Sequence, residues 1–365
     1  NITPCVELTK YLLQADYPED TQVKAMAYHS QQVLLLRHEQ EKHLDDVLKR
    51  KENAGVPQKA FSNPVIRSHL DSCAKNNSHI KNMLFILVAT PVEEVGRDHD
   101  FDWAIIEPSS YRSIVQLAGR VRRHRAEAVE LANIGVMQYN LKAFKTNDKP
   151  DGKYFVKPGY EDGWDKSLHS HDLNKLVNET CINEGLNAIP RIKVPTQADK
   201  QLLAFIEHKV TAAQLTNFSA FGANTLQGYL TETWYLTALP QVLTPFRKSE
   251  PSINLFLFYN ENTDECYFTE KDEKGKHLVD INDQVINRET IQNIKKIELT
   301  ERQRQNLWFE RNYQSLLIKY LSEPWLATPK RVSLRYGEIN MVERENAQYE
   351  YNDQFGLVRV NKKGG

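Results

Sequence analysis

The stretch Gln116-Leu-Ala-Gly-Arg-Val-Arg-Arg123 combines two kinds of residue in a pattern typical of a single helix. At about 100° per residue, Gln116, Arg120 and Arg123 fall on one side, one turn after Arg112. Apolar residues repeat about half a turn away, at the spacing of a face buried against a sheet: Ile114, Leu117, Ala118 and Val121. The sequence therefore predicts a helix whose cationic stripe points away from the core.

An arginine stripe of this kind suits a phosphate ligand. Guanidinium groups are planar and permanently charged, and on a rigid element they can stabilise the charge that develops when a γ-phosphoryl group is transferred. Gln116, one turn earlier, can hold a water or a phosphate oxygen. The alternative is a solvated basic helix face with no fixed partner, which is the common role of charge runs. The residues upstream favour the phosphate interpretation.

Two short strands are expected upstream of this helix. Met83 to Ala89 is an unbroken apolar run, which predicts a central parallel strand covered on both faces. A polar turn over residues 90–100 follows, where open α/β sheets bind their ligands. Trp103 to Glu107 reads as a second buried strand, and Pro108 to Ser110 supply a helix start. The order of these segments indicates an α/β unit.

Two stretches resemble motifs of a known family. Residues 89–102, Ala-Thr-Pro-Val-Glu-Glu-Val-Gly-Arg-Asp-His-Asp-Phe-Asp, resemble motif V of superfamily 2 helicases. Residues 116–123 resemble their motif VI, Q-x-x-G-R-x-x-R. The pattern is most similar to the helicase-nuclease that degrades DNA in type I CRISPR systems. Gly-Arg-Asp-His-Asp stands where that family more often has Ser-Leu-Asp-Ile-Asp, and Gln-Leu where it has Gln-Arg, a variant that resembles subtype I-F.

A third block supports the resemblance. Val23 to Tyr28 reads as a strand, and His29 and Ser30 follow it before a helical segment from Gln32 to Lys51. The resemblance implies that this Tyr-His-Ser lies at a strand end in the second RecA-like lobe and contacts the backbone of the tracked single strand. Alternatively, His29 caps the helix or satisfies a core hydrogen bond.

The resemblance also implies catalytic roles. Arg120 and Arg123 would act as arginine fingers on the γ-phosphate of ATP, and Gln116 would contact the same phosphate or its attacking water. Nothing in the sequence resembles a phosphate-cradling G-x-x-x-x-G-K-[ST] loop or a Mg²⁺-holding Asp-Glu box. ATP and its Mg²⁺ are therefore expected to be shared with a first lobe outside this chain.

Further roles follow for the two loops. Thr90 would contact the DNA backbone, and Asp98 would contact the ribose or a neighbouring motif. Gly96 would permit a close backbone approach, and Gly119 is the motif VI glycine, so that Gly96, Asp98 and Gly119 are the expected nucleotide-contacting residues.

The start of the chain adds an expectation about what is missing. Thr3 and Pro4 can begin a helix from Cys5 to Leu13 with no strand before it, whereas a RecA-like lobe ordinarily begins with a strand. The resemblance implies that the first strand, the first lobe and a nuclease domain with its divalent metal lie outside this sequence. We therefore expect the chain alone to be inactive as an ATPase and as a nuclease.

Composition is consistent with a cytoplasmic chain of more than one domain. It has 365 residues, no apolar run long enough to span a membrane, and four scattered cysteines without a Cys-x-x-Cys pair. The formal net charge of -1 excludes a global basic field, so any DNA contact must be local. Arg302, Arg304 and Arg311 form a second basic cluster, but the aromatic and leucine residues among them favour the buried side of a long helix.

One local cluster could suggest a metal. His169, His171 and Asp172 are good transition-metal ligands, but three neighbouring ligands without a distant fourth rarely make a closed site. Ser-His-Asp-Leu before an apolar helix is equally a capping sequence. We therefore expect no metal site in this chain.

The expected fold is α/β. A RecA-like lobe with a mostly parallel sheet would occupy residues 1–145, a linker or irregular connection 146–195, and a smaller mixed α+β domain 196–365. Further predicted elements are helices at Asn63–Ala74, Gln197–Lys209 and Glu301–Leu321, and strands at Ile134–Leu141, Ile253–Tyr259, Cys266–Thr269, Arg331–Tyr336 and Leu357–Val360.

The resemblance implies a set of partners and leaves two alternatives. The partners are single-stranded DNA, the RNA-guided surveillance complex, adaptation proteins and phage anti-CRISPR inhibitors, with no membrane. One alternative is the second lobe of another superfamily 2 motor, such as an RNA or repair helicase. The other is a non-motor module that binds a nucleic-acid backbone through its arginines.

Overall fold

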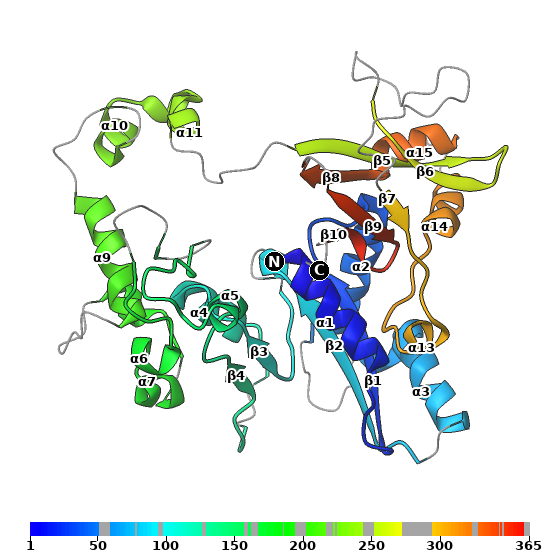
Figure 1. The fold of residues 1–365 in the computed structure, drawn as a ribbon, viewed down its shortest axis with the longest axis horizontal. Helices are drawn as coiled ribbons and strands as arrows, with labels where there is room; N and C mark the ends of the chain where they lie inside the picture. The colour runs from blue at the N-terminus through cyan, green and yellow to red at the C-terminus, as the bar shows by residue number, and fades with distance from the viewer. Residues whose placement is uncertain are drawn as a thin grey trace. The chain divides into compact units, whose positions relative to one another are not determined.

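The structure is a computed structural model of the chain (Figure 1), and the chain divides into two compact units. Unit 1 comprises Asn1–Arg97 and Ser249–Gly365, and unit 2 comprises Asp98–Lys248. The fold is α/β, as predicted, and the described residues form small parallel sheets, an antiparallel sheet and a mixed sheet. The residues that the structure describes are 1–50, 59–76, 79–93, 98–125, 129–156, 160–161, 167–184, 186–193, 202–216, 222, 225–243, 252–271, 294–322, 328–342, 344 and 347–360.

A parallel strand pair lies at the centre of the amino-terminal part of unit 1. β1 (Thr21–Tyr28) pairs with β2 (Asn82–Ala89) over their whole lengths, from Thr21 opposite Asn82 to Tyr28 opposite Ala89. Helix α1 (Ile2–Gln14) packs on both strands. On its other side, β1 exchanges backbone hydrogen bonds with a distant segment, because Ala25 N–H donates to Asn306 O and Ala25 O accepts from Trp308 N–H. Both strands were predicted, and the pairing is confirmed as parallel.

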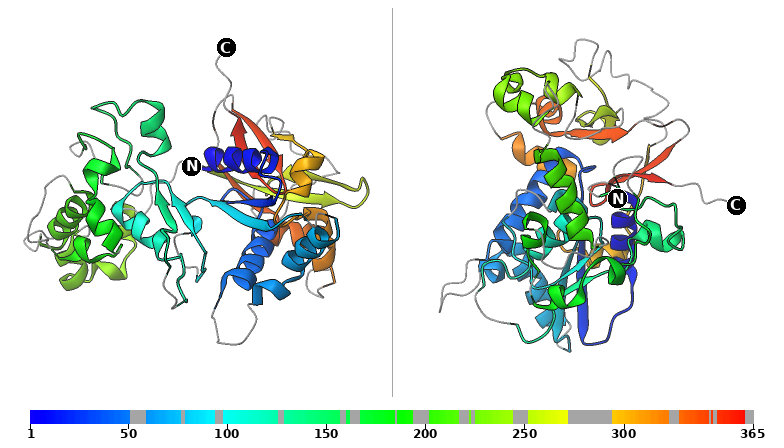
Figure 2. Two further views of the ribbon diagram at one scale, coloured as in Figure 1. Left: turned by 90° about the horizontal axis from the view of Figure 1, so that it is seen from below. Right: turned by 90° about the vertical axis from the view of Figure 1, so that its left-hand side faces the viewer.

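The carboxyl-terminal part of unit 1 builds two three-stranded sheets. One is antiparallel and has the order β6 (Glu265–Thr269), β5 (Ser252–Asn260), β8 (Glu338–Val342). The other has the order β10 (Gly356–Val360), β9 (Gln348–Asn352), β7 (Ile294–Lys296), with one parallel and one antiparallel pairing. Their core includes Leu255, Leu257 and Tyr313 together with Leu35 and Leu36 of α2 (Leu34–Leu48). Segments from both ends of the chain therefore share one hydrophobic core (Figure 2).

Unit 2 has a shorter parallel pair. β3 (Ala104–Ile106) pairs with β4 (Ile134–Val136), and α4 (Tyr111–Ala118) packs beside β3. The core of unit 2 joins Ile106 and Ile114 to the later residues Phe155, Leu168, Leu173 and Leu203.

The remaining elements complete the two units. In unit 1 they are η1 (Lys59–Ser62), α3 (Pro64–Asn76), η2 (Pro91–Glu93), α13 (Glu301–Gln305), α14 (Tyr313–Tyr320) and α15 (Pro329–Tyr336). In unit 2 they are α5 (Leu141–Lys145), α6 (Leu173–Leu176), α7 (Glu179–Glu184), α8 (Ile189–Ile192), α9 (Leu203–Thr216), α10 (Leu226–Thr231), η3 (Trp234–Leu236) and α11 (Leu239–Leu243).

The two units do not coincide with the predicted ranges 1–145, 146–195 and 196–365. The chain after Ser249 packs with the first 97 residues, and 98–145 pack with the chain that follows them. The segment expected as a linker contributes Tyr154, Phe155 and Leu168 to the core of unit 2, and among its described residues the helices are α6, α7 and α8. Tertiary burial of scattered aromatic and leucine residues, invisible to periodicity, accounts for the difference.

Several predicted elements differ from the structure. The long helix Glu301–Leu321 is two helices, α13 and α14, because residues 306–308 leave the helix to bond β1. The strand predicted at Arg331–Tyr336 is part of α15, which Thr328 caps through its side chain. The helix predicted at Gln197–Lys209 starts later, at α9, and residues 194–201 lie outside the described part. β2 is only half covered, with Leu84 39% exposed, rather than buried on both faces.

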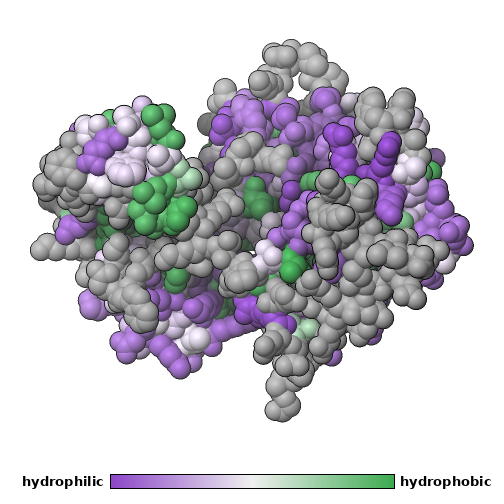
Figure 3. All heavy atoms as spheres, turned by 90° about the horizontal axis from the view of Figure 1, so that it is seen from above, coloured by the Kyte–Doolittle hydropathy of each residue, from purple (hydrophilic) through white to green (hydrophobic). Residues whose placement is uncertain are grey.

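Exposed apolar side chains gather on the segment that carries α10, η3 and α11 (Figure 3). They include Leu230, Leu236 and Val242, each more than three-fifths exposed. Among the described residues, none of the helices is long and apolar enough to cross a membrane.

Candidate functional site

Helix α4 carries the start of the 116–123 stretch. Ser110 caps it, since its hydroxyl accepts from Ser113 N–H at 3.0 Å, and the carboxylate of Glu207 accepts from Tyr111 N–H. Ile114 is buried on the core side, whereas Gln116 is exposed. The two stripe residues that lie on the helix, Arg112 and Gln116, therefore face away from the core, as the periodicity predicted.

The helix ends at Ala118, and this corrects the predicted arginine stripe. Gly119 N–H donates to Val115 O at 3.0 Å, and the backbone then leaves the helix to pair with Phe101. Phe101 N–H donates to Arg120 O at 2.8 Å, and Arg122 N–H donates to Phe101 O at 2.9 Å. The prediction that both arginines extend a helical stripe toward solvent is wrong: Arg120 is only 8% exposed, and neither Arg120 nor Arg123 is helical.

The pairing at Phe101 places the 98–102 segment beside residues 120–125. Asp98 Oδ1 accepts from Arg123 Nε at 2.8 Å and lies 2.9 Å from His124 Nε2. The side chains of Asp98 and Arg123 are each about two-fifths exposed. The hydrogen bond from Arg123 lowers the pKa of Asp98, so that this carboxylate stays charged at neutral pH. Arg123 Nη1 also donates to Gly119 O at 3.2 Å.

A second ion pair joins the same two segments and is more deeply buried than the first. Asp100 is fully buried, and its Oδ1 accepts from Arg125 Nη2 at 2.7 Å and from Nε at 3.1 Å. Arg125 also donates to Phe101 O and to Asp102, while its own side chain is 5% exposed. Burial opposes the charge of Arg125, but its hydrogen bonds to Asp100 and Asp102 outweigh this and raise its pKa.

The two glycines contribute in different ways. Gly119 closes α4 with φ −67°, and a Cβ there would lie 3.3 Å from Val115 O. Gly96 lies outside the described residues. The nucleotide-contacting roles of both glycines stay predictions.

Ser30 and Thr90 lie at one edge of the β1–β2 pair. Tyr28 is opposite Ala89 at the carboxyl end of both strands, and Thr90 N–H donates to Tyr28 O at 3.0 Å. Ser30 is exposed and Thr90 is partly exposed. The two side chains expected to contact DNA therefore follow neighbouring strands at the same sheet edge, as parallel strands require.

His29 is a core residue in this structure. It is 0% exposed, its Nε2 lies 2.9 Å from Phe355 O, and its Nδ1 accepts from Gln31 N–H at 3.2 Å. Burial lowers the pKa of His29 to about 4, so the ring is neutral. These contacts favour the core hydrogen bond over the predicted DNA contact, which a fully buried side chain cannot make.

The second basic cluster is structural. Arg311 is 3% exposed and donates to Gln40 Oε1 at 2.7 Å and to Leu36 O at 3.2 Å, and burial lowers its pKa to about 10. Arg302 pairs with Asp16 and Arg304 with Glu310. The expected burial of the apolar residues around these arginines is confirmed for Leu307, Trp308, Tyr313 and Leu317, although the predicted helix is not continuous.

Residues of the His-Ser-His-Asp sequence cap a helix and form buried ion pairs. Asp172 caps α6, since its side chain accepts from Asn174 N–H at 3.0 Å. The ring of His171 lies between two carboxylates, with Nδ1 2.5 Å from Asp148 Oδ1 and Nε2 2.9 Å from Glu161. No cluster of three or more potential metal ligands arranged to hold an ion was found among the described residues.

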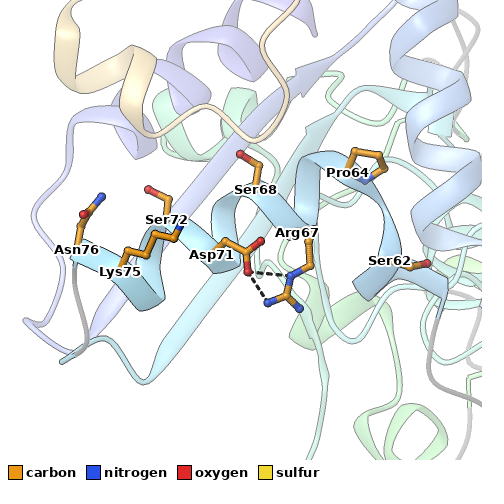
Figure 4. A pocket seen from close by; sticks show the side chains of 8 residues that line it. All are labelled: Ser62, Pro64, Arg67, Ser68, Asp71, Ser72, Lys75 and Asn76. Atoms are coloured by element: carbon orange, nitrogen blue, oxygen red, sulfur yellow. Dashed lines mark hydrogen bonds and ion pairs between the residues drawn. The ribbon is translucent and has the colours of Figure 1, made fainter.

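A shallow hollow of about 570 Å³ lies along α3 (Figure 4). Arg67 and Asp71, one turn apart on α3, form an ion pair in its lining, with Arg67 Nε 2.9 Å from Asp71 Oδ1. Its other lining residues are Ser62, Pro64, Ser68, Ser72, Lys75 and Asn76. None of these residues belongs to the predicted site.

Sequence reasoning missed three residues that support the site. Asp100 and Arg125 form the buried pair, and Glu207 lies 96 residues from the helix start that it caps. Alternation of acidic residues at 98, 100 and 102 is a signal that could have indicated Asp100. No local pattern identifies Glu207, because its contact is made only by the tertiary fold.

Comparison with known proteins agrees with the motif resemblance. The family model for "CRISPR-associated nuclease/helicase Cas3, C-terminal" matches residues 1–126. The chain is 30% identical to a CRISPR-associated nuclease/helicase Cas3 subtype I-F/YPEST of Pseudomonas aeruginosa over 368 residues, which cover 99% of this chain and 31% of the relative. It is 34% identical to the protein of the same description from Pectobacterium atrosepticum over 283 residues, 75% of this chain and 24% of the relative.

The matched residues 1–126 include the strand pair β1–β2 and the interlocked loops at Asp98 and Arg123. The chain spans less than a third of the length of these relatives. From the family model, and from a match that runs along almost the whole chain, we conclude that the chain belongs to the Cas3 nuclease/helicase family and corresponds to its carboxyl-terminal portion.

Proposed function

We propose that this chain supplies the second RecA-like lobe of an ATP-driven translocase that moves along single-stranded DNA, within a helicase-nuclease of CRISPR interference. Residues 89–102 then act as motif V and residues 116–123 as motif VI. The relatives carry the description nuclease/helicase, and they extend well beyond the matched region. ATP with Mg²⁺ would be held jointly with a first lobe, and the divalent metal of the nuclease would be held in a separate domain.

The contact between Asp98 and Arg123 is the single observation that carries this proposal. A guanidinium has five N–H donors, and the contacts to Asp98 and Gly119 O need only two of them. The side chain is 41% exposed, so the group retains donors for an anion at the surface. Asp98 orients Arg123 without burying it, which suits a residue that contacts a phosphate held by another lobe.

The roles divide among the remaining motif residues by exposure. Arg120 is 8% exposed and bonds Phe101 through its backbone carbonyl, so we assign the arginine finger to Arg123 alone. Exposed Gln116 is assigned to the same phosphate or its attacking water. Ser30 and Thr90, at the sheet edge, are assigned to the DNA backbone, and Asp98 carries the link between motifs V and VI.

The proposal predicts separate effects on ATPase and nuclease. In the full-length protein, Arg123→Ala should lower DNA-stimulated ATP turnover by a factor of about 10³ and abolish unwinding. Metal-dependent nicking of single strands should be largely retained, because it needs no phosphoryl transfer from ATP. Arg67→Ala, at the exposed pair on α3, is a matched control and should retain both activities. ATPase retained in Arg123→Ala would refute the finger role.

The chain by itself is expected to be inactive. Its sequence has no phosphate-cradling loop, and Arg123 can act only on ATP that other residues bind. We therefore expect purified protein of this sequence to show no DNA-stimulated ATP hydrolysis, measured by phosphate release against the full-length protein. We also propose that the RNA-guided surveillance complex delivers the DNA, and that adaptation proteins and phage inhibitors bind the complete protein.

A further inference from the structure

The turn that carries Arg123 is held from both sides by residues of the 98–102 segment. On one side, Arg122 N–H donates to Phe101 O at 2.9 Å. On the other, His124 N–H donates to Asp100 Oδ2 at 3.1 Å. Arg122 adopts φ +50°, a conformation that non-glycine residues rarely adopt without support from surrounding contacts. The backbone at Arg123 therefore depends on its neighbours for its direction.

The buried ion pair behind this turn supplies that support. Asp100 is 0% exposed and uses both of its oxygens, Oδ2 for His124 N–H and Oδ1 for Arg125. Arg125 donates to three acceptors within 98–102: Asp100, Phe101 O and Asp102. Two charges removed from water are favourable only when their geometry is good and their hydrogen bonds are satisfied, as here. The pair therefore tolerates little displacement of either loop.

We propose that Asp100 and Arg125 form a buried clamp that positions Arg123 for its contact with the transferred phosphate. This inference rests on the proposed function of Arg123 and names two positioning residues for it. The clamp fixes the backbone of the turn, and Asp98 then orients the guanidinium. Neither Asp100 nor Arg125 touches the phosphate, because both side chains are buried.

A lysine at position 125 would keep the charge but could not span three acceptors in the planar arrangement of a guanidinium. In the full-length protein, we expect Arg125→Lys to weaken the affinity for ADP with aluminium fluoride by about tenfold or more, since small misplacements of a catalytic group are costly. The affinity for ADP alone should remain unchanged. This difference separates positioning from simple loss of folded protein, which would reduce the fraction that binds either ligand.

The decisive measurement is a double-mutant cycle on the same two affinities. If Arg125 acts through Arg123, Arg125→Lys should have no further effect in an Arg123→Ala background. Equal weakening in both backgrounds would overturn the clamp, and so would no effect of Arg125→Lys on the parent protein. Asp100→Asn, which keeps an acceptor for His124 N–H but removes the charge, should behave like Arg125→Lys, and parent-like affinities in that variant would also contradict the clamp.

Arg67→Lys provides the control. Arg67 also donates two hydrogen bonds to one carboxylate, that of Asp71 on α3, and neither residue belongs to the clamp or to the proposed site. The control should leave both affinities unchanged, and a loss equal to that of Arg125→Lys would contradict a specific clamp. Failure of the proposed function has a different signature: Arg123→Ala alone would then bind ADP with aluminium fluoride as tightly as the parent.

Discussion

Oδ1 of Asp98 lies 2.8 Å from Nε of Arg123, a residue 25 positions further along the chain. The bond joins two loops that are well separated in the sequence. The same oxygen lies 2.9 Å from His124 Nε2, so that Asp98 holds two consecutive side chains of the turn. The guanidinium of Arg123 is thereby restricted in direction but remains accessible.

Loss of the Asp98 carboxylate should impair turnover without removing the catalytic group. In the full-length protein, Asp98→Ala leaves Arg123 in place but free to sample other rotamers, so we expect kcat for DNA-stimulated ATP hydrolysis to fall by about tenfold. The kcat of Asp98→Asn should fall less, because this variant keeps an acceptor. Steady-state phosphate release measures both variants. Turnover of Asp98→Ala equal to that of the parent would show that Asp98 does not orient Arg123.

The hydroxyl of Thr90 should contribute to DNA affinity. Thr90→Val keeps the shape of the side chain and removes one donor and acceptor, so the affinity for a labelled single strand should fall about fivefold, the equivalent of about 1 kcal/mol for one hydrogen bond. Fluorescence anisotropy at fixed salt measures the change. Thr211→Val on α9 is the matched control and should bind as the parent does. Unchanged affinity in Thr90→Val would remove this residue from the DNA contacts.

His29 should affect stability rather than DNA binding. Its pKa is about 4 in the folded protein and near 6.5 when unfolded, so the unfolded chain takes up the proton first as pH falls. The stabilisation that the neutral His29 ring contributes is complete above pH 6.5 and is lost as pH falls from 6.5 to 4. Hydrogen–deuterium exchange of the β1 amides, corrected for the intrinsic rate, should show this loss, and His29→Gln should reduce its slope.

A structural role for His29 also predicts a difference from a neighbouring histidine. His29→Ala should lower the local stability of β1 at neutral pH by about 1–3 kcal/mol, because it leaves Phe355 O buried without this partner. His38→Ala, at an exposed position of α2, should have no such effect. Loss of DNA affinity in His29→Ala with unchanged β1 exchange would instead support a direct DNA contact.

The ion pairs of His171 with Asp148 and Glu161 should stabilise unit 2 in a limited pH range. Hydrogen bonds to Glu161 and Asp148 overcome the effect of burial and raise the pKa of His171, so its contribution is present below pH 6.5 and is lost as pH rises through the raised value. Burial opposes ionisation of Glu161, but the His171 and backbone hydrogen bonds lower its pKa to about 2. Its contribution is therefore present above pH 4.5 and is lost as pH falls toward 2.

Replacement of His171 tests the contribution of these ion pairs directly. His171→Gln removes one partner of a buried ion pair and should destabilise the 146–176 region by about 3–5 kcal/mol. Exchange of the amides that Glu161 binds, at Tyr154, Phe155 and Leu168, measures the loss. Exposed His169, replaced in the same way, is the control. If these amides exchange at the parent rate in both variants, the ion pairs of His171 contribute no stability.

The elements with strong local signals were predictable from the sequence. The hairpin of β5 and β6 follows from two apolar runs around a turn, and β1 and β2 follow from theirs. The Thr328-Pro329 pair was an available sign that α15 is a helix, but the alternation of Arg331–Tyr336 favoured a strand. The break between α13 and α14 was not predictable, because it depends on bonds between Ala25 and residues 306 and 308.

The candidate site was predictable only in part. Motif spacing identified Asp98 and Arg123, but it placed Arg123 on a helix that Gly119 ends. Local periodicity cannot detect a backbone pairing such as that between Phe101 and residues 120–122, nor the burial of Arg120 and Arg125 that follows from it. These features arise from long-range contacts, whereas sequence patterns report local preferences.

In the proposed mechanism, Arg123 contacts the transferred phosphate while Asp98 holds the Arg123 guanidinium in position. A structure of the full-length protein with single-stranded DNA, ADP, Mg²⁺ and aluminium fluoride would show this contact. We expect a terminal nitrogen of Arg123 about 3 Å from a fluoride, with Nε still bonded to Asp98. A complex in which another residue occupies that position, with Arg123 directed to solvent, would contradict it.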